Sequence, residues 1–269
     1  MRIAIRHGTV YRYDRPVRFT SQYLRLTPYG NPSQRVINWR LDAPGELAPW
    51  TDGFANHCHT LFCDDGSTEI RVLASGVVET TDTAGVLPFE GGLLVGAFLR
   101  PTPRTRADDS IRRFAEPFRK QAGESVVDGL HALATKLAEE IEYREQGTDV
   151  HSTAAEVLKD GFGVCQDFAH LFISCARAIG VPARYVSGYL YTGESDTPHV
   201  AGHAWAAGWV DGLGWVSFDV ANRTCGTDRY VGLAVALDYD GAAPLRGVRA
   251  GGGADEILEV EVQVQVQAQ

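Results

Sequence analysis

The N-terminal third of the chain has the two-residue hydrophobic period of β-strands. Ile3 and Ile5 alternate with polar neighbours, and Tyr11 and Tyr13 resume this alternation beyond Gly8, where we expect a β-bulge. Short segments of the same kind, separated by turn residues, continue at residues 22–27, 36–41, 53–62, 69–73 and 77–80. This spacing predicts a small antiparallel all-β sandwich domain over residues 1–85.

The period changes to about 3.6 residues in the middle of the chain. Residues 86–108 contain a Pro-Thr-Pro sequence and predict a connection between two domains. Beyond it, Asp109 or Ser110 is suited to cap a short helix, which we expect to be interrupted near Pro117.

Two further helices are predicted before residue 161. Apolar residues spaced three and four apart indicate a helix from about Asp128 to Tyr143. Thr153 and Glu156 have the spacing of a capping box, which predicts a short helix ending near Gly161.

The central stretch of the chain is residues 161–190. A helix is expected to begin at Cys165, and its predicted buried side consists of Phe168, Leu171, Phe172, Cys175 and Ile179. Gly180 is suited to end this helix and Pro182 prevents its continuation. Residues 185–191 are rich in aromatic and β-branched residues and predict a strand.

Strands dominate the remainder. Residues 203–210 and 214–220 flank an Asp-Gly turn and predict a hairpin, and residues 257–267 alternate valine with Glu or Gln, which predicts a strand with one buried face. Predicted helices and strands therefore both occur over residues 109–269.

Composition narrows the class of protein. A net charge of −9 over 269 residues argues against nucleic acid or an anionic membrane as the main partner, and it does not indicate an oligomeric state. Five widely spaced cysteines suit free thiols in a reducing compartment. The N-terminal residues lack the apolar run of a signal peptide, and no stretch reaches the roughly 18 apolar residues of a membrane helix. We therefore expect a cytoplasmic protein.

Candidate chemistry centres on Cys165. A thiol in the first turn of a helix feels the positive end of the helix dipole, which favours the reactive thiolate. His203 begins a strand after a loop, and Asp219 ends the next strand across the hairpin, so the pair can act as base and orienter. Each residue alone is more often structural, but their combined placement suggests a Cys-His-Asp triad.

A metal site is the competing interpretation of another cluster. His57, Cys58, His59 and Cys63 are the residue types that bind zinc. In a strand, however, the two histidines share one face and Cys58 points to the other, which does not suit a tetrahedral site. The sequence therefore predicts no metal and no cofactor.

Several motifs resemble those of bacterial proteins of the transglutaminase-like superfamily, which are often described as cysteine-protease candidates. The motifs are GVCQDFAHL (163–171), GVPARYVSGYL (180–190) and HAW (203–205). Further similarity lies in RLTP (25–28), Gln34, DGFAN (52–56), DY (238–239) and PLRGV (244–248), so the resemblance covers most of the chain.

The resemblance implies a papain-like α+β transglutaminase core over residues 109–269, in which a helix-borne cysteine packs on an antiparallel sheet. It also implies that a β domain precedes this core and that Cys165, His203 and Asp219 form a triad. In such enzymes the thiolate attacks a peptide or glutamine-type amide and forms a thioester, which an amine or water then resolves. Backbone N–H groups at the helix start, including that of Cys165, are natural donors to the oxyanion. The implied partner is a peptide or protein substrate.

This chain departs from the family's pattern at two places. The family commonly has an acidic residue where this chain has Ala207, and commonly has Asp-Pro-Thr-Asn where this chain continues from Asp219 as Val220-Ala221-Asn222. A non-catalytic peptide-binding member of the same superfamily is therefore the alternative function.

Overall fold

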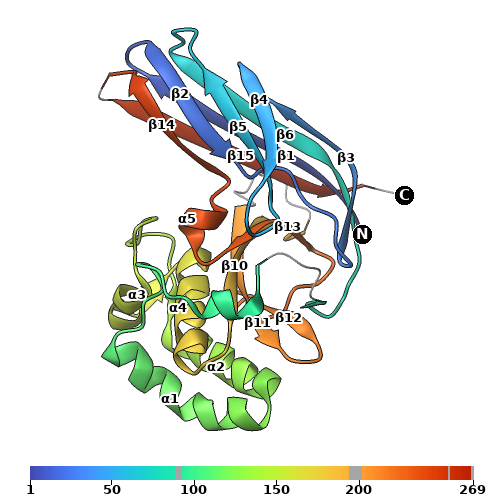
Figure 1. The fold of residues 1–269 in the computed structure, drawn as a ribbon, viewed down its shortest axis with the longest axis vertical. Coiled ribbons are helices and arrows are strands. Elements are labelled where there is room, and N and C mark those ends of the chain that lie inside the picture. The colour runs from blue at the N-terminus through green and yellow to red at the C-terminus, as the bar shows by residue number, and fades with distance from the viewer. Residues whose placement is uncertain (89–92, 194–201, 254, 268–269) are drawn as a thin grey trace.

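The chain forms a β-sandwich that stands on an α+β core (Figure 1). The computed structural model describes residues 1–88, 93–193, 202–253 and 255–267. The predicted fold class, an α+β core with an all-β region built on the N-terminal strands, is confirmed.

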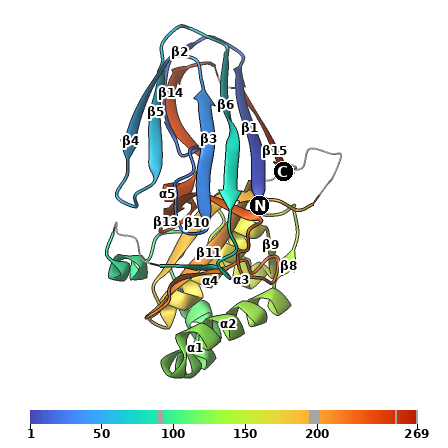
Figure 2. The same ribbon diagram turned by 90° about the vertical axis from the view of Figure 1, so that its right-hand side faces the viewer.

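The sandwich consists of two four-stranded antiparallel sheets, which face each other in Figure 2. The first sheet has the order β15 (Glu256–Val266), β1 (Arg2–Tyr13), β6 (Glu69–Thr80) and β3 (Gln34–Asp42). The second has the order β14 (Leu245–Gly251), β2 (Val17–Leu24), β5 (His57–Cys63) and β4 (Glu46–Thr51). Leu24, Leu61, Ile70 and Val72 are fully or almost fully buried between them, because alternate residues of each strand face the other sheet.

Local details of the sandwich differ from the sequence-based expectations. Gly8 makes no bulge, since β1 pairs with β6 and with β15 without a register shift. Register shifts lie instead in β3, between Val36 and Asn38, and in β14, between Ala250 and Gly251. The two segments expected at residues 69–73 and 77–80 are one continuous strand, β6.

The C-terminal strands belong to the sandwich rather than to the core. β14 pairs with β2, and β15 pairs with β1. Residues 245–266 therefore lie outside the core, although we expected the core to extend over residues 109–269. The free edges of β1 and β2 provide the reason, because an unpaired strand edge is satisfied by a strand from any part of the chain. β15 forms as expected, but Val262 is its one buried residue because the strand lies at a sheet edge.

The core contains a five-stranded sheet covered by helices. Its order is β13 (Tyr230–Ala236), β10 (Ala183–Leu190), β11 (Gly202–Val210), β12 (Gly214–Phe218) and β7 (Val86–Leu87). The expected hairpin forms with Val210 opposite Gly214. β7 and the 3₁₀ helix η1 (Val95–Leu99) lie within the predicted connection. The predicted loop before β11 falls largely in residues 194–201, outside the described residues.

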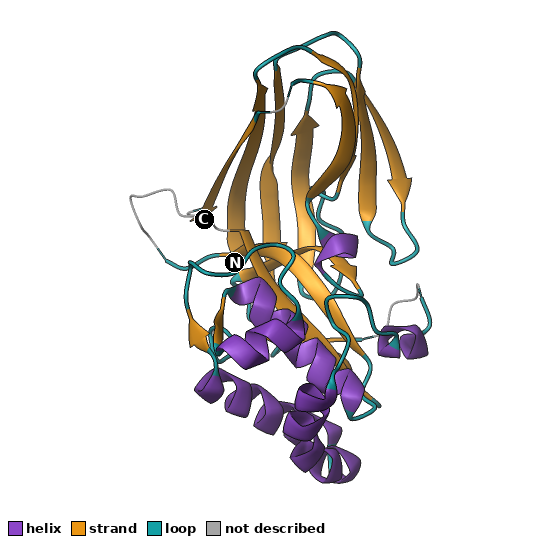
Figure 3. Cartoon of the chain, turned by 90° about the vertical axis from the view of Figure 1, so that its left-hand side faces the viewer, coloured by secondary structure: helices purple, strands orange, loops and turns teal. Residues whose placement is uncertain are grey.

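Four of the helices lie in the half of the molecule opposite the sandwich (Figure 3). They are α1 (Asp109–Glu124), α2 (Val126–Glu140), α3 (Ala154–Asp160) and α4 (Cys165–Ala178), while the short α5 (Tyr239–Ala242) lies at the junction. The capping box of Thr153 and Glu156 forms as predicted. The predicted interruption of the helix at Pro117 was wrong, because α1 continues through this residue. Pro117 is exposed, so water can solvate the backbone carbonyl that loses its hydrogen bond.

Helix α4 is the centre of the core. The predicted buried stripe is confirmed, but every residue from Asp167 to Arg177 is buried, because the sheet covers one side of the helix and other helices the rest. The Arg177 guanidinium donates hydrogen bonds to the carbonyls of Ala183 (2.8 Å) and Leu237 (2.8 Å). These bonds hold the helix end against the sheet.

Two side-chain amides join the sandwich to the core sheet. Gln34 donates to the carbonyl of Gly232 and accepts from its N–H, both at 2.8 Å. Asn56 does the same with Val235, at 2.8 and 2.7 Å. Since β13 is an edge strand and both amides are buried, each amide replaces part of a missing neighbouring strand.

Removing one amide should weaken this junction. In Asn56→Ala, two backbone groups of Val235 lose their partners, and each buried group left unpaired costs about 1–3 kcal/mol. We therefore expect Asn56→Ala to lower the free energy of unfolding, measured by urea denaturation, by this cost. Asn38→Ala, at an exposed position of β3, is the matched control and should have little effect. Equal losses in the two variants would contradict a joining role for Asn56.

Candidate active site

The start of α4 positions the Cys165 thiol. Val164 is extended and immediately precedes the helix, and its N–H donates to the Asp167 carboxylate at 2.9 Å. This bond turns the Asp167 side chain back toward the residue before the helix, so the carboxylate caps the helix start. Gly163 makes room for it, because a Cβ there would lie 2.7 Å from the Asp167 Cβ. The N–H groups of Cys165 and Gln166 belong to the first helical turn and have no intrahelical acceptor.

His203 and Asp219 lie together at the adjacent end of the core sheet. His203 Nε2 is 2.6 Å from Asp219 Oδ2, and their side chains are 11% and 1% exposed. Asp219 follows β12, where its N–H donates to Thr224 and its carbonyl accepts from the same residue. Strand β11 brings His203 opposite Gly188 of β10. The hairpin therefore holds the imidazole and the carboxylate in contact.

Two further side chains support the Asp219 carboxylate. Asn222 Nδ2 and the Tyr230 hydroxyl each donate to Oδ2 at 2.7 Å. The sequence analysis did not assign a role to either residue. The sequence did contain a signal for Asn222, since it is the last residue of the motif that begins at Asp219. Tyr230 had none, because it comes from β13, a strand that the sequence pattern did not predict.

These contacts determine the charge state of the pair. Burial alone would lower the pKa of His203, but hydrogen bonds to Asp219 and Cys165, together with their negative charges, outweigh burial and raise it to about 10. Burial would raise the pKa of Asp219, whereas its hydrogen bonds to His203, Asn222 and Tyr230 lower it overall. Since Nε2 is engaged by Asp219, Nδ1 is the nitrogen that remains for the thiol. The arrangement favours a protonated imidazole at His203, next to Cys165.

Cys165 and His203 open into a cleft of about 270 Å³ between the core and the sandwich. The core contributes Gln166, Tyr185 and Tyr189 to it. Much of the rest of its wall comes from β1 and β15 of the sandwich. The cleft is therefore lined by both parts of the chain.

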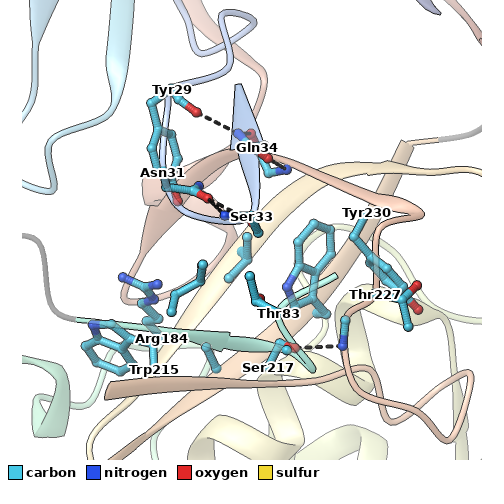
Figure 4. Close-up of a pocket in the computed structure, with 17 residues that line it drawn as sticks. Tyr29, Asn31, Ser33, Gln34, Thr83, Arg184, Trp215, Ser217, Thr227 and Tyr230 are labelled. Atoms are coloured by element: carbon cyan, nitrogen blue, oxygen red, sulfur yellow. Dashed lines mark hydrogen bonds between the residues drawn. The ribbon is translucent and has the colours of Figure 1, made fainter. Parts of the chain in front are cut away.

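Trp205 packs beneath His203 rather than lining this cleft. Its ring stacks on the imidazole with a centroid distance of 6.1 Å, and it lies on the sheet face away from α4. A second cavity, of about 50 Å³, lies on that face, with Gln34 and Tyr230 among its lining residues (Figure 4). Ala207 lines this second cavity and not the first, so the departure at residue 207 lies away from Cys165.

The alternative metal cluster has other contacts. Cys58 donates to the carbonyl of Asn56, and Cys63 donates to that of Pro44. Across the residues that the structure describes, no group of three or more His, Cys, Asp or Glu side chains is arranged to hold a metal ion. Cys58 is buried and His57 is exposed, so the two point in different directions.

Comparison with known proteins identifies the family. Residues 112–220 match the family model of the transglutaminase-like superfamily, and residues 3–79 match that of the bacterial transglutaminase-like N-terminal region. An uncharacterised protein of Mycobacterium leprae is 30% identical over 280 residues, which cover 98% of each chain. The chain belongs to the transglutaminase-like superfamily.

Other relatives are consistent with this membership. An uncharacterised protein of Mycobacterium tuberculosis is 30% identical over 293 residues, covering 98% of this transglutaminase-like chain and 92% of the relative. The solved structure of a candidate cysteine protease from Cytophaga hutchinsonii has the same fold, with a TM-score of 0.75 at 21% identity over all of this chain and 92% of the other. The members of this superfamily are, in general, thiol enzymes. Among the described residues, no helix is long and apolar enough to cross a membrane.

The protonation of His203 can be measured directly. We expect its imidazole to remain protonated at neutral pH and to titrate near a pKa of about 10, followed by NMR of the histidine ring. In Asp219→Asn the strongest interaction that raises this pKa is lost while burial still lowers it, so the pKa of His203 should fall. Asp211→Asn, in the turn at the other end of β11, is the control and should leave the titration unchanged.

The pKa shifts of His203 and Asp219 also determine how the stability of the folded protein changes with pH. Because the pKa of His203 is raised on folding, its contribution is complete below about pH 6.5 and is lost as the pH rises through about 10. The pKa of Asp219 is lowered, so its contribution is lost as the pH falls through the acidic range. A wild-type His203 that titrates below 6.5 would contradict this assignment.

Proposed function

We propose that this protein is a thiol acyl-transfer enzyme that acts on peptide or glutamine-type amides through a thioester. The observation that carries the proposal is the 2.6 Å contact between His203 and a buried Asp219, at the sheet end that faces the helix start bearing Cys165. Membership of the transglutaminase-like superfamily supports the same chemistry.

Each of the three residues has one role in the proposed reaction. Cys165 reacts as the thiolate, with its proton already held on His203 Nδ1, and the sulfur attacks the amide carbonyl carbon. The imidazolium then returns the proton to the leaving amine as the C–N bond breaks, which leaves a thioester. Water or a second amine attacks the thioester and releases the acyl group from the sulfur. Asp219 positions the imidazole and balances its charge throughout.

The helix start also supplies donors for the transition state. The carbonyl oxygen becomes negatively charged when the sulfur adds to the carbon. The N–H groups of Cys165 and Gln166, which no helical carbonyl accepts, are suited to stabilise that charge. Loss of a single oxyanion donor typically lowers kcat by about 10²–10³-fold, so these groups contribute substantially to the proposed rate.

Reactivity of the thiol tests the proposal. We expect iodoacetamide at neutral pH to alkylate Cys165 about tenfold or more faster than Cys225, whose pKa is raised by burial. The rates are measured by mass spectrometry of digested protein at timed intervals. Asp219→Asn should leave Cys165 alkylatable but slow turnover of peptide amides strongly, since the imidazole loses its orienter.

Two cysteine variants complete the test. Cys165→Ala should abolish turnover with the fold retained, whereas Cys225→Ala should retain turnover. If Cys165 reacts no faster than Cys225, the protein is instead a non-catalytic peptide-binding member of the superfamily.

A separate experiment identifies the group that accepts the acyl chain: peptides are incubated with the protein, with and without a primary amine. Incorporation of the amine indicates transamidation, and cleavage or deamidation indicates transfer to water.

A further inference from the structure

One wall of the Cys165 cleft is a regular two-stranded surface of the sandwich. In the pairing of β1 with β15, His7 lies opposite Val262, Thr9 opposite Val260 and Tyr11 opposite Leu258. Residues two apart in a strand share a face, so all six side chains point to the same side of the sheet. All six line the cleft. We refer to these six residues as the β1–β15 face.

The β1–β15 face lies across the cleft from other apolar residues. Tyr239 of α5, Pro244 and Leu245, the first residue of β14, line the same cleft. Cys165 and His203 line it from the core. A chain bound at the thiol would therefore have its neighbouring side chains between two apolar walls.

The cleft is uncharged apart from the proposed catalytic pair. Among the described residues that line it, there is no Asp, Glu, Lys or Arg. His7 is 4% exposed, and its Nδ1 lies 2.9 Å from the Tyr189 hydroxyl. Burial lowers the pKa of His7 to about 4, so this side chain is neutral at neutral pH. A charged substrate side chain would lose its hydration here without gaining a partner of opposite charge.

The outer strand of this face is also open to a ligand. β15 is the terminal strand of its sheet in the described structure, so one backbone edge has no neighbouring strand. Leu258 and Val260 are 52% and 42% exposed although they belong to the apolar side of the cleft. An edge strand with such side chains is suited to bind an extended peptide, because its backbone groups and alternate side chains are both accessible.

We propose that the β1–β15 face is the specificity subsite, and that it takes a bulky uncharged apolar side chain next to the amide attacked by Cys165. The occupant is an extended peptide segment, whose apolar residue packs against Leu258 and Val260. This inference rests on the proposed function, since it assigns the substrate class of the same thiol. It gives the sandwich a direct role in substrate selection.

Peptidyl chloromethyl ketones test the subsite without knowledge of the natural substrate. The Cys165 sulfur displaces chloride and forms a thioether, so alkylation reports both binding and thiol reactivity. We compare acetyl-phenylalanyl, acetyl-aspartyl and acetyl-lysyl chloromethyl ketones, each rate being divided by the rate of that reagent with free cysteine. We expect the phenylalanyl reagent to alkylate Cys165 about tenfold or more faster than either charged one.

Variants of β15 then locate the preference. Val260→Asp and Leu258→Asp should each lower the relative rate of the phenylalanyl reagent about tenfold and raise that of the lysyl reagent, because a carboxylate replaces an apolar contact. Ile257→Asp is the matched control: this residue is 59% exposed on the same strand, but it points to the opposite face and should change neither rate. Thermal unfolding verifies that the variants fold.

Iodoacetamide separates the two possible failures. If it alkylates Cys165 no faster than Cys225, the proposed function fails and the subsite fails with it. If Cys165 is reactive but the three ketones show equal relative rates, the thiol chemistry stands and the apolar subsite is wrong. The subsite is also wrong if Val260→Asp and Leu258→Asp behave like Ile257→Asp. A phenylalanyl preference that both cleft-facing variants reduce supports it.

Discussion

The unpaired edge of β13 is the constraint on which the rest of this structure depends. A buried strand edge must find hydrogen-bond partners, and here side-chain amides replace the missing strand. Gln34 pairs with Gly232, and Asn56 pairs with Val235. Asn56 is itself held by the Asp52 carboxylate at 2.9 Å. Because these amides are short, the sandwich sits directly against the sheet, and β1 and β15 are brought over the start of α4.

Strand β13 also connects this junction to the proposed chemistry. Tyr230, the first residue of the strand, donates to Asp219, while Gly232 and Val235 further along the strand hold the sandwich. Asp219 in turn contacts His203. A shift of β13 would therefore disturb both the orienter of the imidazole and the wall opposite the thiol.

Much of the core could be predicted because its signals are local. The 3.6-residue period and the helix-ending residues Gly180 and Pro182 define α4, and the Asp-Gly turn defines the hairpin that Asp219 directly follows. These elements contain the three proposed catalytic residues, and the structure brings His203 and Asp219 into contact.

The missed features depend on contacts distant in sequence. β14 and β15 pair with strands more than two hundred residues earlier, which no local period indicates. Tyr230 reaches Asp219 through β13, whose residues are buried on both faces and so lack the alternation of a half-exposed strand. α1 continues through Pro117 because that position faces water, a property that the residue type alone does not reveal.

The core is inserted between strands of the sandwich, and this order has a consequence for biosynthesis. β1 and β2 are made first, but their partners β15 and β14 follow the whole core. A nascent chain therefore carries two open sheet edges while the core is being translated, and such edges invite pairing with other chains. The thiol and its base are synthesised before β15, so a newly made core holds its reactive groups before the wall opposite them exists. The proposed specificity subsite is thus completed later in synthesis than the groups proposed for bond breaking.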